Sequence, residues 1–258
     1  MCNNDSHTSS KLSRRNAVAT LIALGTASAL GRQLLGGKLI ASAMAAVDGC
    51  TLAPAIEIGP YFVDERLNRS DITENASTAF IAQAATLFLT INAYSGVGSA
   101  CSPLHGVQID IWHCHAGGLY SDESANGTTG LTWLRGYQLT DANGNVTFKT
   151  IFPGWYQGRT IHIHAMARWF DVNGNATYTF TTQLFFVESL NNAVLAAAPY
   201  NTRGNRDTTN VADHDYDASM LVDTQPNGDG SYTGSIALGL ALAPQTSDVI
   251  FANGFESA

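Results

Sequence analysis

The chain has 258 residues, of which 45% are apolar and 13% are charged, and this composition excludes both a disordered chain and a bundle of membrane helices. The formal net charge is −8, and because the first 46 residues hold five cations and one anion, residues 47–258 carry −12. A body this acidic argues against nucleic acid or an anionic membrane surface as a partner.

Residues 1–46 have the pattern of a removable export signal. Ser13-Arg14-Arg15-Asn16 is a twin-arginine motif, residues 17–30 form a weakly hydrophobic stretch, and the small residues of 41–45 offer cleavage sites. The apolar run is interrupted at Gly25 and is too short for a good membrane-spanning helix. We therefore expect a periplasmic or extracellular protein, exported by the twin-arginine route, with no membrane span in its mature form. An ordinary buried or anchoring helix is the alternative.

The cysteines agree with export. Cys50 and Cys101 flank the first stretch of the mature chain and could form a disulfide, as extracytoplasmic proteins often do. Cys114 lies in an alternating apolar run, which favours a buried free thiol.

Residues 47–258 read as one domain of short strands separated by turns, with poor helical periodicity. Strands spaced in this way predict an all-β fold, a β-sandwich of mostly antiparallel strands with long loops and little helix. A short helix is expected only near Ala193–Ala198, and the purpose of the terminal Val249–Glu256 segment is left open. The expected strands are residues 87–93, 107–112, 145–151, 160–167, 178–187 and a final hairpin or strand within 228–242.

Two pairs of histidines are candidate metal ligands. His162 and His164 are two residues apart in a predicted strand, so both imidazoles project from one face and can reach a single metal ion. His113 and His115 have the same spacing on the strand that begins at Val107. No second pair of donors is evident near them, so we expect a structural role for this pair.

Two tyrosines are further candidate metal ligands, but only in combination with the histidines. A phenolate binds a metal when a hard, highly charged ion such as iron(III) lowers its pKa, whereas zinc sites use Cys, His and carboxylates. Ferrous oxygenases use two histidines and one carboxylate. Tyr120 and Tyr156 are the candidates, although a single tyrosine is more often a core residue.

The motifs around these residues resemble those of the intradiol ring-cleavage dioxygenases. The segment DIWHCHAGGLYS at 110–121 is similar to the first iron-tyrosine motif of that family, and PGWYQGRTIHIH at 153–164 is similar to the second. Residues 134–144 look like the connecting strand, and GPY at 59–61 looks like the N-terminal segment. The resemblance extends over about residues 50–242. Within the family, the chain most resembles the exported, single-chain members. His115 departs from the expected Asp or Asn, and the helical dimerisation segment of the catechol-type members is absent, so the oligomeric state is open.

The resemblance implies that Tyr120, Tyr156, His162 and His164 bind iron(III) together with a water or hydroxide. It also implies that dioxygen and a small aromatic diol are the substrates. The ring would be cleaved between its two hydroxyl-bearing carbons to give a muconate-type dicarboxylate. Tyr156 would dissociate and accept a substrate proton, while Tyr120 stays bound.

The same resemblance assigns roles to residues around the ligands. Arg159 would stabilise the charged, activated substrate, unless it forms only a surface salt bridge. Gln183 would lie near the substrate oxygens, unless it is only a polar position on a sheet face. Tyr61 and Trp155 are expected to form pocket walls, although both could be plain core aromatics. Strand alternation points Arg159 away from His162, unless the strand begins after Arg159.

Two other functions remain open on the sequence alone. The first is an exported β-sandwich binding module without iron, which would use exposed aromatic residues. The second is a zinc or copper enzyme in which the two His-x-His strands face one another. No basic residue other than Arg159 is placed for a ring carboxylate, which leans slightly away from a carboxylated catechol.

Overall fold

The computed structural model describes residues 51–74, 78–96 and 101–243. The chain divides into two compact units, Met1–Met44 and Ala45–Ala258, and all of the described residues belong to the second. The predicted export signal, Cys50 and the Val249–Glu256 segment lie outside the described residues.

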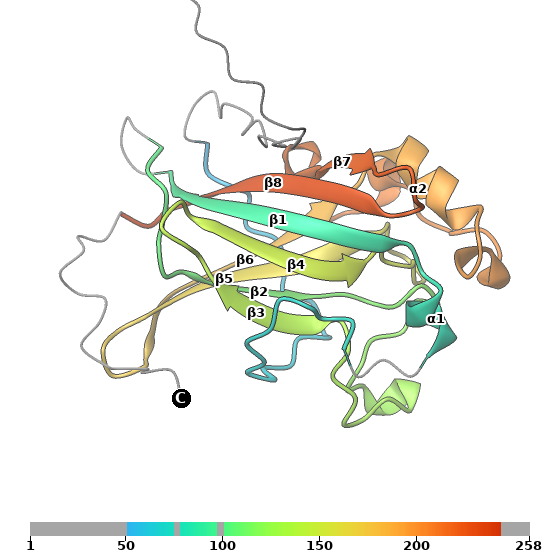
Figure 1. Ribbon diagram of the computed structural model, residues 1–258, viewed down its shortest axis with the longest axis horizontal. Helices are drawn as coiled ribbons and strands as arrows, with labels where there is room; N and C mark the ends of the chain where they lie inside the picture. Colours follow the sequence, from blue (N-terminus) through green and yellow to red (C-terminus); the bar gives the residue numbers. More distant parts are fainter. Residues whose placement is uncertain (1–50, 75–77, 97–100, 244–258) are drawn as a thin grey trace, which may run out of the picture. The chain divides into compact units, whose positions relative to one another are not determined.

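Two four-stranded sheets form the domain, which confirms the predicted β-sandwich (Figure 1). The order of one sheet is β4-β1-β8-β7 and that of the other is β3-β2-β5-β6. All neighbouring strands are antiparallel except β1 and β8, which run parallel. The strands are β1 (Thr86–Ser95), β2 (Gln108–Trp112), β3 (Arg135–Leu139), β4 (Asn145–Ile151), β5 (His162–Phe170), β6 (Ala176–Phe185), β7 (Asp223–Pro226) and β8 (Tyr232–Leu240).

The two sheets differ in how their faces are buried. In β1, Leu87 and Leu89 are fully buried while the intervening Phe88 is 40% exposed, which is the alternation of a strand with one face in the core. Every residue of β2 is buried, as are the first six of β5. These two strands therefore have two buried faces, one on the sandwich core and one on a second cluster.

The second cluster contains the candidate site. Ile163 and Ala165 of β5 pack into the main core. Met166, which has the opposite parity on the strand, packs with Trp112 of β2, Cys114 and Tyr120 in the separate cluster. His162 and His164 share the parity of Met166, so the pleat of β5 directs both imidazoles to this side.

Among the described residues, helices are few and short, as the sequence predicted. α1 (Ala79–Ala82) and α2 (Glu188–Leu195) lie at the same end of the sandwich (Figure 1). The expected helix at Ala193–Ala198 overlaps only the end of α2. Its position was wrong because α2 begins after Val187, a residue that makes no side-chain capping hydrogen bond and gives no start signal. The remaining helices are single 3-10 turns at Ser124–Asn126, Tyr200–Arg203, Asn210–Ala212 and Ala218–Met220.

The cysteines have different states. Cys101 is disulfide-bonded, and its predicted partner is the undescribed Cys50. Cys114 is a free, buried thiol, as predicted. Within the described ranges, none of the helices has the length and apolarity needed to cross a bilayer.

Candidate metal centre

The four predicted ligand residues converge on one small space. The Nε2 atom of His162 lies 3.5 Å from Tyr120 Oη, 3.3 Å from Tyr156 Oη and 3.2 Å from His164 Nε2. Tyr120, His162 and His164 are at most 2% exposed, while Tyr156 is half-buried. Two phenol oxygens and two imidazole nitrogens therefore face one another inside the protein.

The strand register places the two histidines. β5 pairs with β2 on one side and β6 on the other, so that His164 lies opposite both Trp112 and Gln183. Gly59 closes the site from the N-terminal segment: a Cβ atom at this position would lie 3.2 Å from His164 Cε1, and its φ is +71°. The predicted GPY segment is thus in direct contact with a candidate ligand.

Two loops bring the tyrosines to the histidines. Tyr120 follows the turn at Gly117 and Gly118, in which the His115 carbonyl accepts a hydrogen bond from Gly118 N–H. Tyr156 lies in the loop between β4 and β5. A Cβ atom on Gly154 would lie 2.5 Å from the carbonyl oxygens of His115 and Ala116, so only glycine allows these loops to approach so closely.

Burial keeps both imidazoles neutral. It lowers the pKa of His162 to about 3 and that of His164 well below its usual range. His162 Nδ1 lies 2.7 Å from the Thr160 carbonyl oxygen, which can only accept, so this nitrogen carries the proton. The lone pair of His162 Nε2 therefore points into the shared space, the tautomer that metal binding requires.

Burial also keeps the phenols protonated in the absence of a cation. It raises the pKa of Tyr120 well above 10, and it raises that of Tyr156 to about 12 against the opposing effect of Arg159. A cation among these groups would favour both phenolates and both neutral imidazoles. The arrangement can therefore hold a metal ion through two oxygens and two nitrogens.

Arg159 lies beside these groups in the loop that precedes β5. Because β5 begins at His162, strand alternation does not turn Arg159 away. Its Nε donates to Asp213 Oδ2 at 2.9 Å, and its Nη2 lies 3.1 Å from Asp215 Oδ2. This is a largely buried ion pair, because the side chain of Arg159 is 12% exposed.

Gln183 joins the same network from β6. It is fully buried, and its Oε1 accepts from Arg159 Nη2 at 2.5 Å. Its Nε2 donates to the Glu57 carbonyl at 3.1 Å and to Asp215 Oδ2 at 3.3 Å. Gln183 thus connects Arg159 to the N-terminal segment that carries Gly59.

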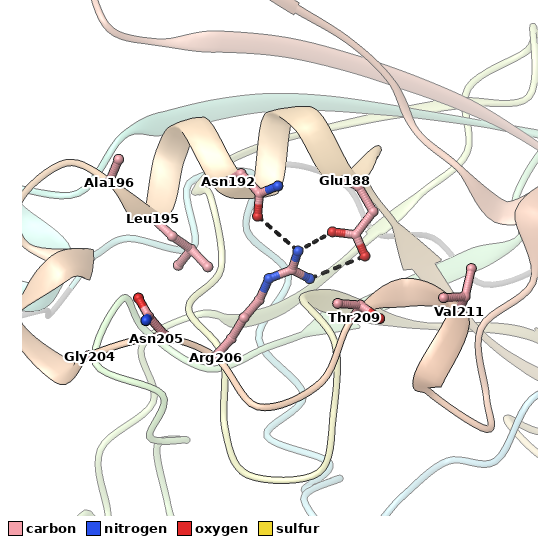
Figure 2. A pocket seen from close by; sticks show the side chains of 9 residues that line it. All are labelled: Glu188, Asn192, Leu195, Ala196, Gly204, Asn205, Arg206, Thr209 and Val211. Carbon is pink, nitrogen blue, oxygen red and sulfur yellow. Dashed lines mark hydrogen bonds and ion pairs between the residues drawn. The ribbon is translucent and has the colours of Figure 1, made fainter.

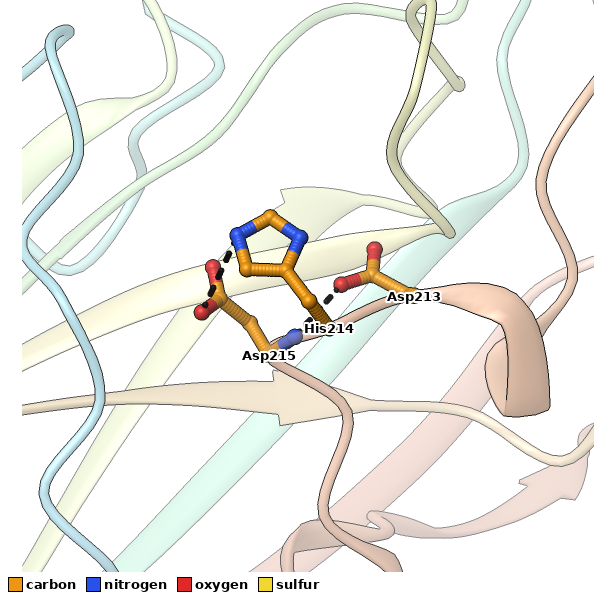
Figure 3. A group of neighbouring side chains, drawn as sticks. All are labelled: Asp213, His214 and Asp215. Carbon is orange, nitrogen blue, oxygen red and sulfur yellow. Dashed lines mark hydrogen bonds and ion pairs between the residues drawn. The ribbon is translucent and has the colours of Figure 1, made fainter.

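Asp213 and Asp215 were not found from the sequence, because nothing local distinguishes them from other loop carboxylates. Figure 3 shows them on one turn of chain, with the His214 ring beside Asp215. The ligand atoms of the three residues lie within 4.8 Å of one another, close enough to hold a cation. The oxygens of the carboxylates are engaged, however, by Arg159, by Thr160 N–H and by Asp215 N–H. A cation at this turn would have to displace a guanidinium.

The two predicted pocket walls have different surroundings. Tyr61 stacks on Tyr120, with ring centroids 4.3 Å apart, and meets Tyr156 edge-on at 5.7 Å. Trp155 packs against the main core and lies under the guanidinium of Arg203, 4.8 Å from its ring centroid. The structure therefore brings Tyr61 to the ligands and gives Trp155 other contacts.

The rival pair of histidines does not face His162 and His164. β2 ends at Trp112, so His113 and His115 lie in the following loop, and β2 is a neighbour of β5 in one sheet rather than opposite it. His113 Nδ1 lies 2.9 Å from the Cys114 carbonyl and Nε2 lies 2.7 Å from Thr150 Oγ1. His115 Nδ1 accepts from Gly117 N–H at 2.9 Å. The geometry required by a four-histidine site is therefore absent among the described residues, and the expected structural role fits these contacts.

A broad surface hollow lies elsewhere, between α2 and the loop 204–211 (Figure 2). Arg206, the one cation among the described residues that line it, forms an ion pair with Glu188 and donates to Asn192 at 2.9 Å. The charged groups of this hollow are thus directed at one another.

The chain is similar to known dioxygenases in sequence and in structure. A family described as dioxygenase matches residues 58–191. An intradiol ring-cleavage dioxygenase from Tetranychus urticae is 30% identical, with a TM-score of 0.63 over 78% of this chain and 98% of that chain. The dioxygenase domain of a carbohydrate-binding fusion from Streptomyces sp. SirexAA-E is 28% identical, with a TM-score of 0.55 over 75% and 100%.

Catechol 1,2-dioxygenase from Acinetobacter sp. ADP1 shares the fold, at 19% identity and a TM-score of 0.51 over 80% of this chain and 67% of that chain. No curated protein sequence matches this chain significantly.

Proposed function

The chain belongs to the intradiol ring-cleavage dioxygenases, which are oxidoreductases that incorporate dioxygen, and from this premise we propose that it opens a catechol-type ring between its two hydroxyl-bearing carbons. The product would be a muconate-type dicarboxylate. The observation that carries the proposal is the convergence of Tyr120, Tyr156, His162 and His164 around one space.

We propose that these four residues hold iron(III). Metal–ligand distances of about 2 Å place neighbouring ligand atoms about 3 Å apart, and the corresponding distances here are 3.2–3.5 Å. Two phenol oxygens suit a hard, highly charged ion and would balance much of its charge. When bound, the ferric ion would draw electron density from a catechol and make its ring reactive toward dioxygen.

Tyr156 and Tyr120 would have different parts in this reaction. Tyr120 is 2% exposed and is packed under Tyr61, so it is the phenol held in place. Tyr156 is half-buried, and Arg159 favours its phenolate form. Its Oη is therefore the atom at which a substrate proton would be accepted and held.

Arg159 and Gln183 would orient and stabilise the substrate as it gains negative charge. The guanidinium is fixed by two carboxylates and by Gln183 Oε1, so it needs no rearrangement when charge develops near it. Tyr61 would cover the site beside Tyr120 and limit the access of water.

We also propose that the protein acts outside the cytoplasm. The twin-arginine motif of residues 1–46 motivates this, and the disulfide at Cys101 supports it, since such bonds persist mainly in oxidising compartments.

The test is the visible spectrum and iron content of the purified protein, before and after catechol is added, for wild type, Tyr156→Phe and Tyr61→Phe. Wild type should bind iron, show a tyrosinate-to-iron band that shifts with catechol, and release a product containing both atoms of labelled dioxygen. Tyr156→Phe should lose much of the band. Tyr61→Phe, which keeps a ring against Tyr120, should retain it.

A colourless protein that retains no iron after ferric loading would refute the proposal. Such a protein would instead be a binding module. If zinc or copper were retained and Tyr156→Phe left the metal content unchanged, a different metal enzyme would be indicated.

A further inference from the structure

The positive charge of Arg159 is shared by two carboxylates. Asp213 Oδ2 lies 2.9 Å from its Nε, and Asp215 Oδ2 lies 3.1 Å from its Nη2. The side chain of Asp213 is 0% exposed and that of Asp215 is 13% exposed, so solvent screens neither well. One guanidinium and two carboxylates together present a net charge of about −1 beside the candidate ligands.

Two of the three guanidinium nitrogens of Arg159, Nε and Nη2, are also engaged. Its Nε donates to Asp213, and its Nη2 donates to Gln183 Oε1 and faces Asp215. A carboxylate on a substrate ring usually needs a free, bidentate guanidinium. Arg159 can offer one only by giving up partners that are already buried.

Other arginines around the site are directed at other groups. Arg135 is 2% exposed and donates to the Tyr61 carbonyl and to Ser121. Arg168 pairs with Asp64 and Asp110 at 2.8 and 2.6 Å, and Arg203 donates to the Trp155 carbonyl. Arg135 and Arg168 therefore have buried or carboxylate partners, whereas Arg203 lies over the ring of Trp155.

We infer that Asp215 makes this site selective for catechols whose ring carries no carboxylate or other anionic substituent. The inference rests on the proposed ring-cleavage function and extends it to a substrate class. Its physical basis is that an anionic substituent would meet the uncompensated carboxylate charge behind Arg159, whose Nη2 is already engaged by Gln183 and Asp215.

Asp215 can be tested separately from its structural surroundings. Asp213 also accepts from Thr160 N–H at 2.6 Å and from Asp215 N–H at 2.9 Å, so its replacement would disturb the backbone. Asp215 has one oxygen on Arg159 and Gln183 and the other 3.5 Å from the exposed His214. Asp215→Asn can therefore keep the inner acceptor and place its amide N–H groups toward solvent.

The experiment compares 4-methylcatechol with 3,4-dihydroxybenzoate, for wild type, Asp215→Asn and Asp223→Asn. Asp223 is an exposed residue of β7 whose carboxylate accepts from Gln225, so its replacement removes the same charge away from Arg159. Two ratios between 4-methylcatechol and 3,4-dihydroxybenzoate are measured for each protein. The first is the ratio of their kcat/KM values in air. The second is the ratio of their dissociation constants, measured by calorimetry on the iron-loaded protein without oxygen.

The wild-type protein should have a higher kcat/KM and a lower dissociation constant for 4-methylcatechol than for 3,4-dihydroxybenzoate. Asp215→Asn should reduce this preference about tenfold, as expected for removing one poorly screened charge near the ligand, and Asp223→Asn should leave it unchanged. Wild-type preference for 3,4-dihydroxybenzoate, or equal ratios for the two variants, would overturn the inference.

The binding ratio separates this inference from the proposed function. If wild type binds the neutral compound more tightly but cleaves neither, ring cleavage fails while the charge argument stands. If neither compound binds, the inference falls together with the proposed function.

Discussion

The indole of Trp112 stacks on the imidazole of His164, with ring centroids 4.9 Å apart and planes inclined by 5°. The two residues are direct partners in the β2–β5 register. The Nδ1–H group of His162 donates a hydrogen bond to the Thr160 carbonyl, but His164 Nδ1 has no hydrogen-bond partner among the described residues. Packing between Trp112 and the segment at Gly59 therefore fixes the plane of the His164 ring.

Replacing Trp112 should for this reason affect metal binding as well as stability. Trp112→Ala should lower the free energy of unfolding by about 3–5 kcal/mol, the usual loss for a buried large aromatic residue. It should also reduce the iron content, because His164 gains rotational freedom. Trp112→Phe, which keeps a ring on His164, should retain most of the iron. Denaturant titration and metal analysis check this, and full iron content in Trp112→Ala would contradict it.

Gly59→Ala should disturb the site in two ways. Its φ of +71° disfavours alanine by about 1–2 kcal/mol, and the added Cβ would press on His164 Cε1 at 3.2 Å. Gly174→Ala is the matched control, since Gly174 has φ +80° and open space around its Cβ position. Both variants should lose similar stability, but only Gly59→Ala should shift the iron absorption band. If the absorption spectra of Gly59→Ala and Gly174→Ala were identical, Gly59 would be required only for its backbone conformation and not for the position of His164.

Asp213 should contribute stability that depends on pH. Burial alone would raise the pKa of Asp213, but the N–H groups of Thr160 and Asp215 and the Arg159 guanidinium together lower it. A carboxyl group whose folded pKa lies below its unfolded value stabilises the fold above about pH 4, and the stabilisation is lost as the pH falls through the folded pKa.

Asp213→Asn should accordingly cost about 3 kcal/mol at pH 7, where it breaks a buried pair. The difference in unfolding free energy from wild type should shrink as the pH is lowered below about 4. Denaturant titrations at several pH values measure it. A difference that is constant with pH would mean that the charge of Asp213 has no part in the stabilisation.

Cys114 should resist alkylation in the native protein. Burial raises the pKa of the Cys114 thiol to about 12, so roughly one thiol in ten thousand is ionised at pH 8. Treatment with iodoacetamide, followed by mass spectrometry of the peptide that contains Cys114, should show labelling only after denaturation. Rapid labelling of the folded protein would show that this cluster opens readily.

Thr150→Val should destabilise the fold without changing the iron content. Thr150 is fully buried, and its hydroxyl is hydrogen-bonded to His113 Nε2, which would be left unpaired at a cost of about 1–3 kcal/mol. Thr147→Val, at an exposed position of the same strand, should change stability little. Loss of iron in Thr150→Val alone would return His113 to the list of candidate ligands.

The sequence predicted the sandwich because strand periodicity is a local property. The predicted strand 145–151 coincides with β4, and 87–93 lies within β1. The final hairpin or strand expected within 228–242 contains β8. β7, which begins at Asp223, was not predicted, because its four residues carry no alternating pattern. Pairing with β8, rather than its own sequence, makes this segment a strand.

The convergence of the four predicted ligands could be expected because their motifs resemble those of a known family, and the spacing of His162 and His164 is itself informative. Asp213, Asp215 and Trp112 could not be assigned in this way. Their contacts with Arg159 and His164 arise from a loop more than 50 residues away and from cross-strand register, neither of which leaves a local signature. Trp155 was expected to be a pocket wall or a core aromatic, and it packs against the main core. Consecutive loop residues such as Trp155 and Tyr156 can face different neighbours.

The parallel pairing of β1 with β8 has a consequence for how the protein is made. The register pairs Leu87 with Tyr232, so the sheet that contains β1, the first described strand, is incomplete until β8 has been made. Pairings between such distant segments form slowly, because a long loop must be closed before they contribute. A nascent chain that stops short of Tyr232 exposes the edge of β1, a surface prone to aggregation. The sandwich therefore cannot close before the chain has been synthesised as far as β8.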